Sequence, residues 1–142
     1  TYGQVGEAKA GEMKSVLGRA KSMEGEGVRL RGPVPKMKLV QELRSSRVML
    51  YRGDLNETFC LAVGEAQAMG VPAVVGNLGS VNERVLHNKT GFVVEEQKSF
   101  IESSAKLLID DNRWRTQHRA ALRTQRSWRW PQAASAFEAL LV

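Results

Sequence analysis

The chain has 142 residues, of which 42% are hydrophobic and 25% are charged, and its net charge is +6. This length and composition fit one folded domain with a substantial core and exclude an intrinsically disordered chain. No apolar run approaches the roughly 20 residues of a membrane-spanning helix, and one cysteine, Cys60, excludes an internal disulfide and a cysteine-rich zinc site. We therefore expect a cytoplasmic protein. Because the chain begins with Thr1 rather than Met, we also expect a fragment of a longer protein.

Residues 1–27 are the least defined part of the sequence. A helix is predicted over Met13–Lys21, but glycines surround and interrupt this stretch. An α/β domain of the kind predicted below usually opens with a buried strand, and none is visible here. We expect that strand to lie before Thr1 or to end in the first residues of the chain.

Residues 28–110 alternate between strand and helix patterns. Short apolar runs bounded by turn residues predict strands at 28–30, 47–51, 72–76 and 91–94. The predicted helices cover residues 35–46, 57–69, 81–86 and 98–109. The last two strands are apolar without alternation, which is typical of a parallel sheet covered on both faces. The sequence therefore predicts an α/β core with a doubly wound parallel sheet.

Residues 111–142 are predicted to form C-terminal helices, with an N-cap for the first in Asp110-Asp-Asn112 and Pro131 at the start of the last. A helical projection gathers arginines on one face of the first helix: Arg115, Arg119, Arg123, Arg126 and Arg129. The opposite face holds Trp114, Ala120, Ala121 and Trp128. Two interpretations stay open. The segment Arg113–Arg129 is a solvated helix face, or it contacts an anionic membrane or a lipid-linked acceptor.

Two glutamates eight residues apart, Glu57 and Glu65, carry the main functional signal. Glu57 lies where a predicted strand, a glycine-containing loop and a helix start meet, at the sheet edge where open α/β sheets bind ligands. The first N–H groups of that helix, around Thr58, Phe59 and Cys60, suit an anion such as a diphosphate. Carboxylates in turn match the neighbouring hydroxyls of a sugar or a ribose. Two simpler hypotheses stay open: a capping box in which Glu57 satisfies a backbone N–H near Asp54, and a solvated Glu65.

The pattern around the glutamates is longer than the pair. The chain carries, in this order, Glu57-Thr-Phe-Cys, Glu65-Ala-Gln-Ala-Met-Gly-Val-Pro-Ala-Val-Val75, Gly79-Ser-Val-Asn-Glu83 and Thr90-Gly-Phe-Val-Val94. This order resembles the E-x7-E signature of the retaining GT-B glycosyltransferases, the glycosyl transferases group 1 family, and the resemblance runs from about Val28 to Leu141. It implies the C-terminal, Rossmann-like domain of such an enzyme, which binds a nucleoside-diphosphate sugar.

The resemblance also implies roles for individual residues. Glu57 would be catalytic and contact the transferred sugar, and Glu65 would contact the ribose hydroxyls. The amides of Thr58, Phe59, Cys60 and Leu61 would hold the sugar and the diphosphate. Val34 would lie against the nucleobase, and Gly79 would allow a close backbone approach. No metal or other cofactor is expected. The expected partners are the donor and an N-terminal acceptor-binding domain, which together would transfer a sugar to a glycan or a lipid-linked acceptor.

The chain departs from the family pattern at several positions. Thr58 and Cys60 replace usual glycines, which predicts a narrower pocket, and Tyr51-Arg52 replaces a usual Pro-Ser pair. The basic pair that neutralises the leaving diphosphate in this family is not found in residues 1–27. We therefore expect the fragment alone to be inactive. Cys60 is predicted to be buried, with its thiol pKa lowered by the helix N-terminus.

Two other functions stay open. A sugar-nucleotide epimerase shares the fold but needs acid–base carboxylates and a histidine in the cleft. A non-catalytic basic module would bind RNA or an anionic membrane through the arginine-rich helix, with a steep dependence on salt. Neither alternative explains the two glutamates as well as a donor site does, and no nucleic acid is expected as a partner.

Overall fold

The structure is a computed structural model that describes residues 7–127 and 129–140. The chain divides into two compact units, residues 1–35 and residues 36–142. The first unit contains α1 (Glu7–Ser22), the short 3₁₀ helix η1 (Glu24–Glu26) and an extended segment over residues 28–35. The helix predicted over 13–21 is confirmed and is longer at both ends.

The strand predicted at 28–30 is wrong. These residues are extended but belong to no strand, and the amide of Val28 donates instead to the carbonyl of Met23 at 3.2 Å. Leu30 is exposed, and the arginines on either side of it give the run no apolar face to bury. A strand is stable only when a neighbour pairs with it, and composition over three residues is a weak guide to that pairing.

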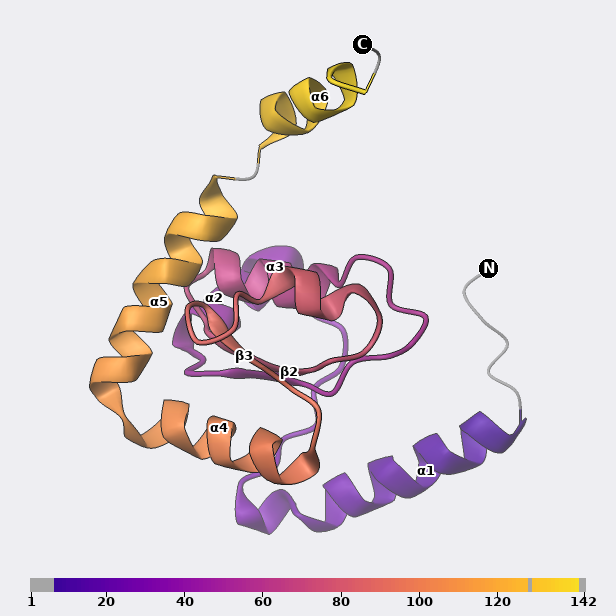
Figure 1. Ribbon diagram of the computed structural model, residues 1–142. Coiled ribbons are helices and arrows are strands. Elements are labelled where there is room, and N and C mark those ends of the chain that lie inside the picture. The colour runs from indigo at the N-terminus through magenta and orange to yellow at the C-terminus, as the bar shows by residue number, and fades with distance from the viewer. Residues whose placement is uncertain (1–6, 128, 141–142) are drawn as a thin grey trace. The chain divides into compact units, whose positions relative to one another are not determined.

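Three short strands form a parallel sheet in the second unit (Figure 1): β1 (Met49–Tyr51), β2 (Ala73–Gly76) and β3 (Gly91–Val94). Their order is β1-β2-β3, with Met49 opposite Ala73 and Ala73 opposite Gly91. Every residue of the central strand β2 is buried, as the unbroken apolar run predicted. The α/β fold with a parallel sheet is thus confirmed.

Helices cover both faces of this sheet. On one face, Val75 of β2 belongs to the core that includes Val63 of α3 (Leu61–Ala68) and Val81 of η2 (Gly79–Arg84). On the other face, Val74 of β2 packs with Leu107 of α4 (Gln97–Ile109). Neighbouring strand residues thus point into opposite cores, as the two-residue period of a strand requires. The helix α2 (Lys36–Ser45) precedes β1 in the chain.

Two helix predictions need correction. The helix predicted over 57–69 begins only at Leu61, because Cys60 has the left-handed φ of 51°, which a right-handed helix does not continue through. The segment predicted as a helix over 81–86 is instead the 3₁₀ helix η2. The first correction leaves residues 52–60 as an irregular loop that follows the carboxyl end of β1.

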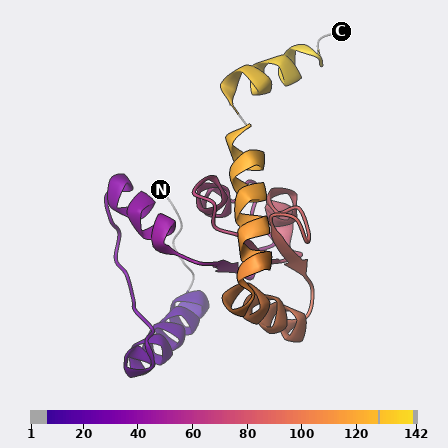
Figure 2. The ribbon, with the colours of Figure 1, turned by 90° about the vertical axis from the view of Figure 1, so that its left-hand side faces the viewer.

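The C-terminal helices are α5 (Asp111–Arg126) and α6 (Trp130–Glu138). α5 lies against α3 and α4 through a buried face formed by Gln117, Ala120 and Ala121 (Figures 1 and 2). Its arginines are exposed on the rest of the helix, as predicted, whereas Trp128 lies outside the described residues. No helix in the described part of the chain combines the length and the apolar character needed to cross a membrane.

Candidate functional site

The candidate site is the loop between β1 and α3, which a second loop supports. The carboxylate of Asp54 accepts a hydrogen bond from the amide of Asn56 at 2.8 Å, which closes a tight turn. The amide of Ser80 donates to the carbonyl of Glu57 at 2.9 Å. Gly79 has a φ of 59°, and a Cβ atom added there would lie 2.3 Å from the carbonyl oxygen of Asp54. A glycine is therefore required where the two loops meet.

Glu57 is bound to its own loop. One carboxylate oxygen, Oε1, accepts hydrogen bonds from the amides of Cys60 at 2.9 Å and Phe59 at 3.4 Å. The other, Oε2, accepts from the hydroxyl of Tyr51 at 3.2 Å. The Cys60 amide is the main reason that the pKa of Glu57 is lowered from its usual value. A negative charge is thus already stabilised at this loop, and the capping box with Asp54 is not formed.

Cys60 is the N-cap residue of α3 and adopts a backbone conformation that glycine prefers. The glycine expected at this position from the family pattern therefore has a physical reason, although Cys60 replaces it. The side chain is buried, as predicted, and packs with the core below α3. Burial raises the pKa of the Cys60 thiol, so the prediction that the helix N-terminus lowers this pKa is wrong. Desolvation opposes the charged thiolate more than the helix end favours it.

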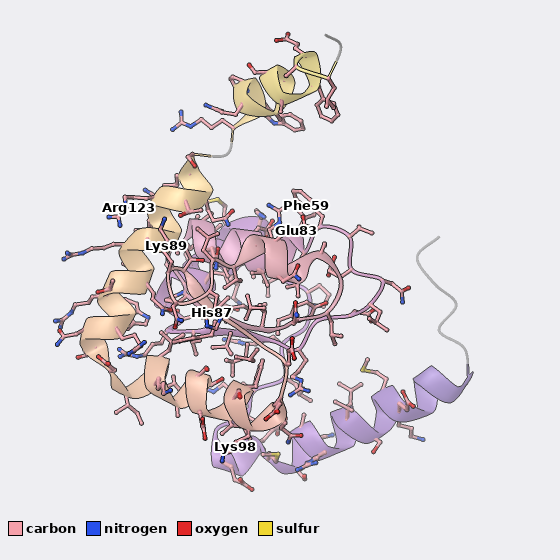
Figure 3. All side chains as sticks on the ribbon, in the orientation of Figure 1. Phe59, Glu83, His87, Lys89, Lys98 and Arg123 are labelled. Atoms are coloured by element: carbon pink, nitrogen blue, oxygen red, sulfur yellow. The ribbon has the colours of Figure 1, made fainter. Side chains whose placement is uncertain are left out.

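Two amides of the predicted anion site remain available. Neither the Thr58 nor the Leu61 amide donates a hydrogen bond to another described residue, and both residues are exposed. Leu61 is the first residue of α3, where helix N–H groups have no partner within the helix. The exposed Phe59 lies on the same loop (Figure 3). The loop thus has two N–H groups without an acceptor among the described residues, and two others, those of Phe59 and Cys60, that donate to Glu57.

Glu65 lies one helical turn into α3 and faces α2 rather than the loop. Its carboxylate forms an ion pair with the ammonium group of Lys36, and Glu65 is therefore not simply a solvated helix residue. Both side chains also line a small pocket whose other residues are apolar: Leu39, Val40, Leu43, Ala68 and Met69. Glu57 and Glu65 thus have different partners in this structure.

Val34 lies in the first unit, so its predicted contact with a nucleobase stays a prediction. Three residues of the second unit were missed as site residues. Tyr51 and Lys36 bind the two glutamates, and the Nε atom of Arg84 donates to the carbonyl of Phe59 at 2.7 Å. The replacement of Pro-Ser by Tyr51-Arg52 was a signal for the first of these. Nothing in the sequence marks Lys36 or Arg84 as a site residue, because only the fold brings them to their partners.

No metal centre is evident where the structure can be inspected. Within residues 7–127 and 129–140, no three His, Cys, Asp or Glu side chains gather as metal ligands would. The two histidines are engaged elsewhere, since the Nδ1 atoms of His87 and His118 lie 2.9 Å and 2.6 Å from the carbonyl oxygens of Val93 and Gly70. The side chains and main-chain groups described at the site are carboxylates and backbone amides.

Comparison with known proteins identifies relatives of this chain. The sequence profile described as glycosyl transferases group 1 matches residues 6–125. A GDP-mannose-dependent alpha-(1-6)-phosphatidylinositol monomannoside mannosyltransferase from Mycobacterium tuberculosis is 39% identical over 74 residues, which is 50% of this chain and 19% of the relative. A D-inositol 3-phosphate glycosyltransferase from Streptomyces avermitilis is 31% identical over 111 residues, which is 77% of this chain and 24% of the relative.

The fold has a solved counterpart. Sucrose-phosphate synthase from Thermosynechococcus elongatus matches with a TM-score of 0.73 at 20% identity, covering 92% of this chain and 35% of that protein. This chain thus spans about a quarter or less of the curated relatives and about a third of the structural one. The profile match, the parallel α/β fold and the order of the motifs agree, and the chain belongs to the glycosyl transferases group 1 family, with the fold of a GT-B glycosyltransferase domain.

Proposed function

We propose that this chain is the donor-binding domain of a retaining glycosyltransferase that uses a nucleoside-diphosphate sugar. One observation carries the proposal: the loop before α3 presents the free amides of Thr58 and Leu61 beside the carboxylate of Glu57. Amides at a helix N-terminus bind the diphosphate, because they donate hydrogen bonds and the helix dipole favours an anion. A carboxylate at the same place repels phosphate but accepts hydrogen bonds from sugar hydroxyls.

In this proposal the two glutamates bind different parts of the donor. Glu57 binds the hydroxyls of the transferred sugar at the loop, and the amides of Phe59 and Cys60 are shared between Glu57 and the ligand. Glu65, one turn further along α3, binds the ribose diol. The ion pair with Lys36 holds the Glu65 carboxylate in place for that contact. The mycobacterial relative carries GDP-mannose in its name, so GDP is the first nucleotide to test.

The whole enzyme would pass the sugar to a hydroxyl of a glycan or a lipid-linked acceptor. An N-terminal domain would bind that acceptor, and the active site would lie between the two domains. No metal takes part in the proposal, because backbone amides and basic side chains outside this chain would neutralise the leaving diphosphate. The epimerase alternative is disfavoured, because His87 and His118 both bind main-chain carbonyls and neither lies on the loop.

Calorimetric titration with UDP, GDP and ADP tests the donor site. We expect one nucleotide to bind saturably to the 142-residue chain and Glu65→Ala to weaken it by about tenfold to 100-fold, because hydrogen bonds to charged groups contribute about 1.5–3 kcal/mol. Glu102→Ala, which removes an exposed glutamate from α4, is the matched control and leaves the affinity unchanged. Equal affinities of the Glu65→Ala variant and the wild type would contradict the assignment of the ribose site.

We also propose that the exposed arginines of α5 contact an anionic membrane surface. Arg119 and Arg123 form no hydrogen bond or ion pair with the described residues, and Arg123 lies on the outer side of α5 (Figure 3). The lipid in the name of the mycobacterial relative supports this surface, which would lie on the cytoplasmic side. Each basic residue near an anionic bilayer contributes about 1 kcal/mol.

Sedimentation with vesicles tests this second proposal. We expect the chain to sediment with phosphatidylglycerol-containing vesicles but not with pure phosphatidylcholine, and the double variant Arg119→Glu/Arg123→Glu to lose this binding. The double variant Lys14→Glu/Lys21→Glu in α1 changes the net charge by the same amount as the arginine variant and serves as the control. Salt-sensitive binding to RNA without binding to the vesicles would instead support the basic-module alternative.

A further inference from the structure

One peptide group in the candidate site is held at both ends. The N–H of Cys60 donates to the Glu57 carboxylate at 2.9 Å, and the carbonyl oxygen of Phe59 accepts from the guanidinium of Arg84 at 2.7 Å. These two groups belong to the same peptide unit, whose N–H and C=O point in opposite directions because the bond is trans. Glu57 and Arg84 therefore fix the rotation of this unit from its two sides.

Arg84 makes a second contact with the same residue. Its guanidinium carbon lies 3.4 Å from the centroid of the Phe59 ring, a close cation–π arrangement. Arg84 is itself anchored, since it ends η2 and its carbonyl accepts a hydrogen bond from Gln125 of α5 at 3.4 Å. The exposed Phe59 is thus held by Arg84, which is itself anchored to the packed part of the domain.

These contacts maintain a backbone conformation that costs free energy. Cys60 has a φ of 51°, and a left-handed residue other than glycine is strained by about 1–2 kcal/mol. Rotating the preceding peptide by about 180° would take this φ from 51° to about −129°, out of the left-handed region that favours glycine. The same rotation would turn the Cys60 N–H away from Glu57 and put the Phe59 carbonyl in its place. An acceptor would then face the ligand where a donor faces it now.

We infer that Arg84 is a positioning residue of the donor site, which holds the Phe59–Cys60 peptide with its N–H toward Glu57 and the bound sugar. The inference rests on the proposed donor site. It explains how the chain holds a left-handed residue at this position with a cysteine in place of the glycine of the family pattern: Arg84 stabilises from outside what a glycine would allow by itself. Arg84 acts through the peptide and does not contact the donor.

The experiment combines two readouts on the 142-residue chain. In ¹⁵N–¹H spectra, the Cys60 amide proton reports its bond to Glu57, and calorimetry with the bound nucleotide sugar reports the donor site. We expect Arg84→Ala to move the Cys60 resonance upfield and to weaken binding about tenfold, the loss of one hydrogen bond to a charged group. Arg84→Lys can still donate to the Phe59 carbonyl, so its Cys60 resonance and its affinity stay close to those of the wild type. Arg44→Ala, which removes an exposed arginine near the end of α2, changes neither.

A second variant separates positioning from general damage. In the Arg84→Ala background, Cys60→Gly restores binding, because glycine adopts the left-handed conformation without support. An unchanged Cys60 resonance and unchanged affinity in Arg84→Ala would overturn the inference, as would a failure of Cys60→Gly to restore any binding. If the wild type binds no nucleotide sugar, the proposed function fails, and with it the role of Arg84 in donor binding. The Cys60 resonance would still show whether Arg84 holds the peptide.

Discussion

Two helices of this domain begin beside a carboxylate that accepts a backbone hydrogen bond three residues later. Before α5, Asp110 accepts from the amide of Arg113 at 2.9 Å, and before α3, Glu57 accepts from the amide of Cys60 at the same distance. In both cases that amide is the main reason that the carboxyl pKa is lowered. The two ends nevertheless differ in backbone and neighbours.

Asp110 is an ordinary N-cap. Its backbone is extended, the helix starts at the next residue, and an ion pair with Arg113 adds to the contact. Glu57 instead lies three residues before the N-cap, across a loop that ends in the strained Cys60 and leaves the Thr58 and Leu61 amides free. At α5 the capping carboxylate lies directly before the helix, and the backbone of its residue is relaxed. The start of α3 instead keeps a strained residue in place, as binding sites do.

The largest expected effect on stability comes from Gly79, the glycine at which the Glu57 loop meets the loop that supports it. Gly79→Ala puts a Cβ atom against the carbonyls of Asp54 and Glu57 at a left-handed residue, and should reduce the free energy of unfolding by more than about 2 kcal/mol. Gly64→Ala inside α3 has open space around it and should raise the free energy of unfolding by about 0.5–1 kcal/mol. Urea unfolding measures both. Equal midpoints for Gly79→Ala and the wild type would contradict the fit of the two loops.

Removal of the two carboxylates should separate a ligand contact from a helix cap. Glu57→Ala is expected to weaken nucleotide-sugar binding about tenfold or more, because hydrogen bonds between the ligand and the carboxylate are lost. It should also lower the unfolding temperature, because the loop loses the acceptor for its own amides. Asp110→Ala is expected to lower the unfolding temperature and leave the affinity unchanged, because it removes only a cap. Calorimetry and thermal unfolding of the same two variants test this. The comparison is wrong if Asp110→Ala weakens binding as much as Glu57→Ala does.

Acid should weaken both carboxylate contacts in the same direction. A lowered pKa means that the stabilisation is present above the unfolded value, 4.5 for Glu57 and 3.8 for Asp110, and is lost as the pH falls through the folded pKa. The amide resonances of Cys60 and Arg113 should therefore stay constant from about pH 7 to about pH 5 and shift only in stronger acid. A shift of the Cys60 resonance centred near neutral pH would exclude Glu57 as its partner.

The smallest effect is expected at Cys60 itself in the otherwise wild-type chain. Cys60→Gly removes about 1–2 kcal/mol of left-handed strain, but it also loses a buried side chain and loosens the unfolded chain. The free energy of unfolding should change by less than about 1 kcal/mol in either direction. The native thiol should react slowly with a disulfide reagent, because it is buried and its pKa is raised. Rapid reaction in the folded protein would contradict both the burial of the thiol and its raised pKa.

The sequence predicted the parts of this domain that depend on local patterns. The apolar run around Val74 and a cap within Asp110-Asp-Asn112 were predicted, because each depends on consecutive residues, and the structure identifies Asp110 as the cap. The wrong predictions concern features that depend on more than consecutive residues. The start of α3 depends on a left-handed Cys60, and the unpaired 28–30 run depends on whether another strand is available.

The candidate site was predicted in the same uneven way. Glu57, Glu65 and the amides between them lie in one continuous motif, which the sequence makes visible. The partners Tyr51, Lys36 and Arg84 come from β1, α2 and η2, and only folding brings them to the motif. A pattern therefore located the site, and tertiary contacts decide how its groups are held.

The most direct test of the donor site is an amide map of nucleotide-sugar binding. GDP-mannose, followed by UDP- and ADP-sugars, would be titrated into the ¹⁵N-labelled chain. The account predicts saturable shifts at the amides of Thr58, Phe59, Cys60 and Leu61, and none at the Asp110–Arg113 start of α5. Shifts at both helix starts alike, or at neither with any of the sugars, would contradict the claim that the loop before α3 is the donor site.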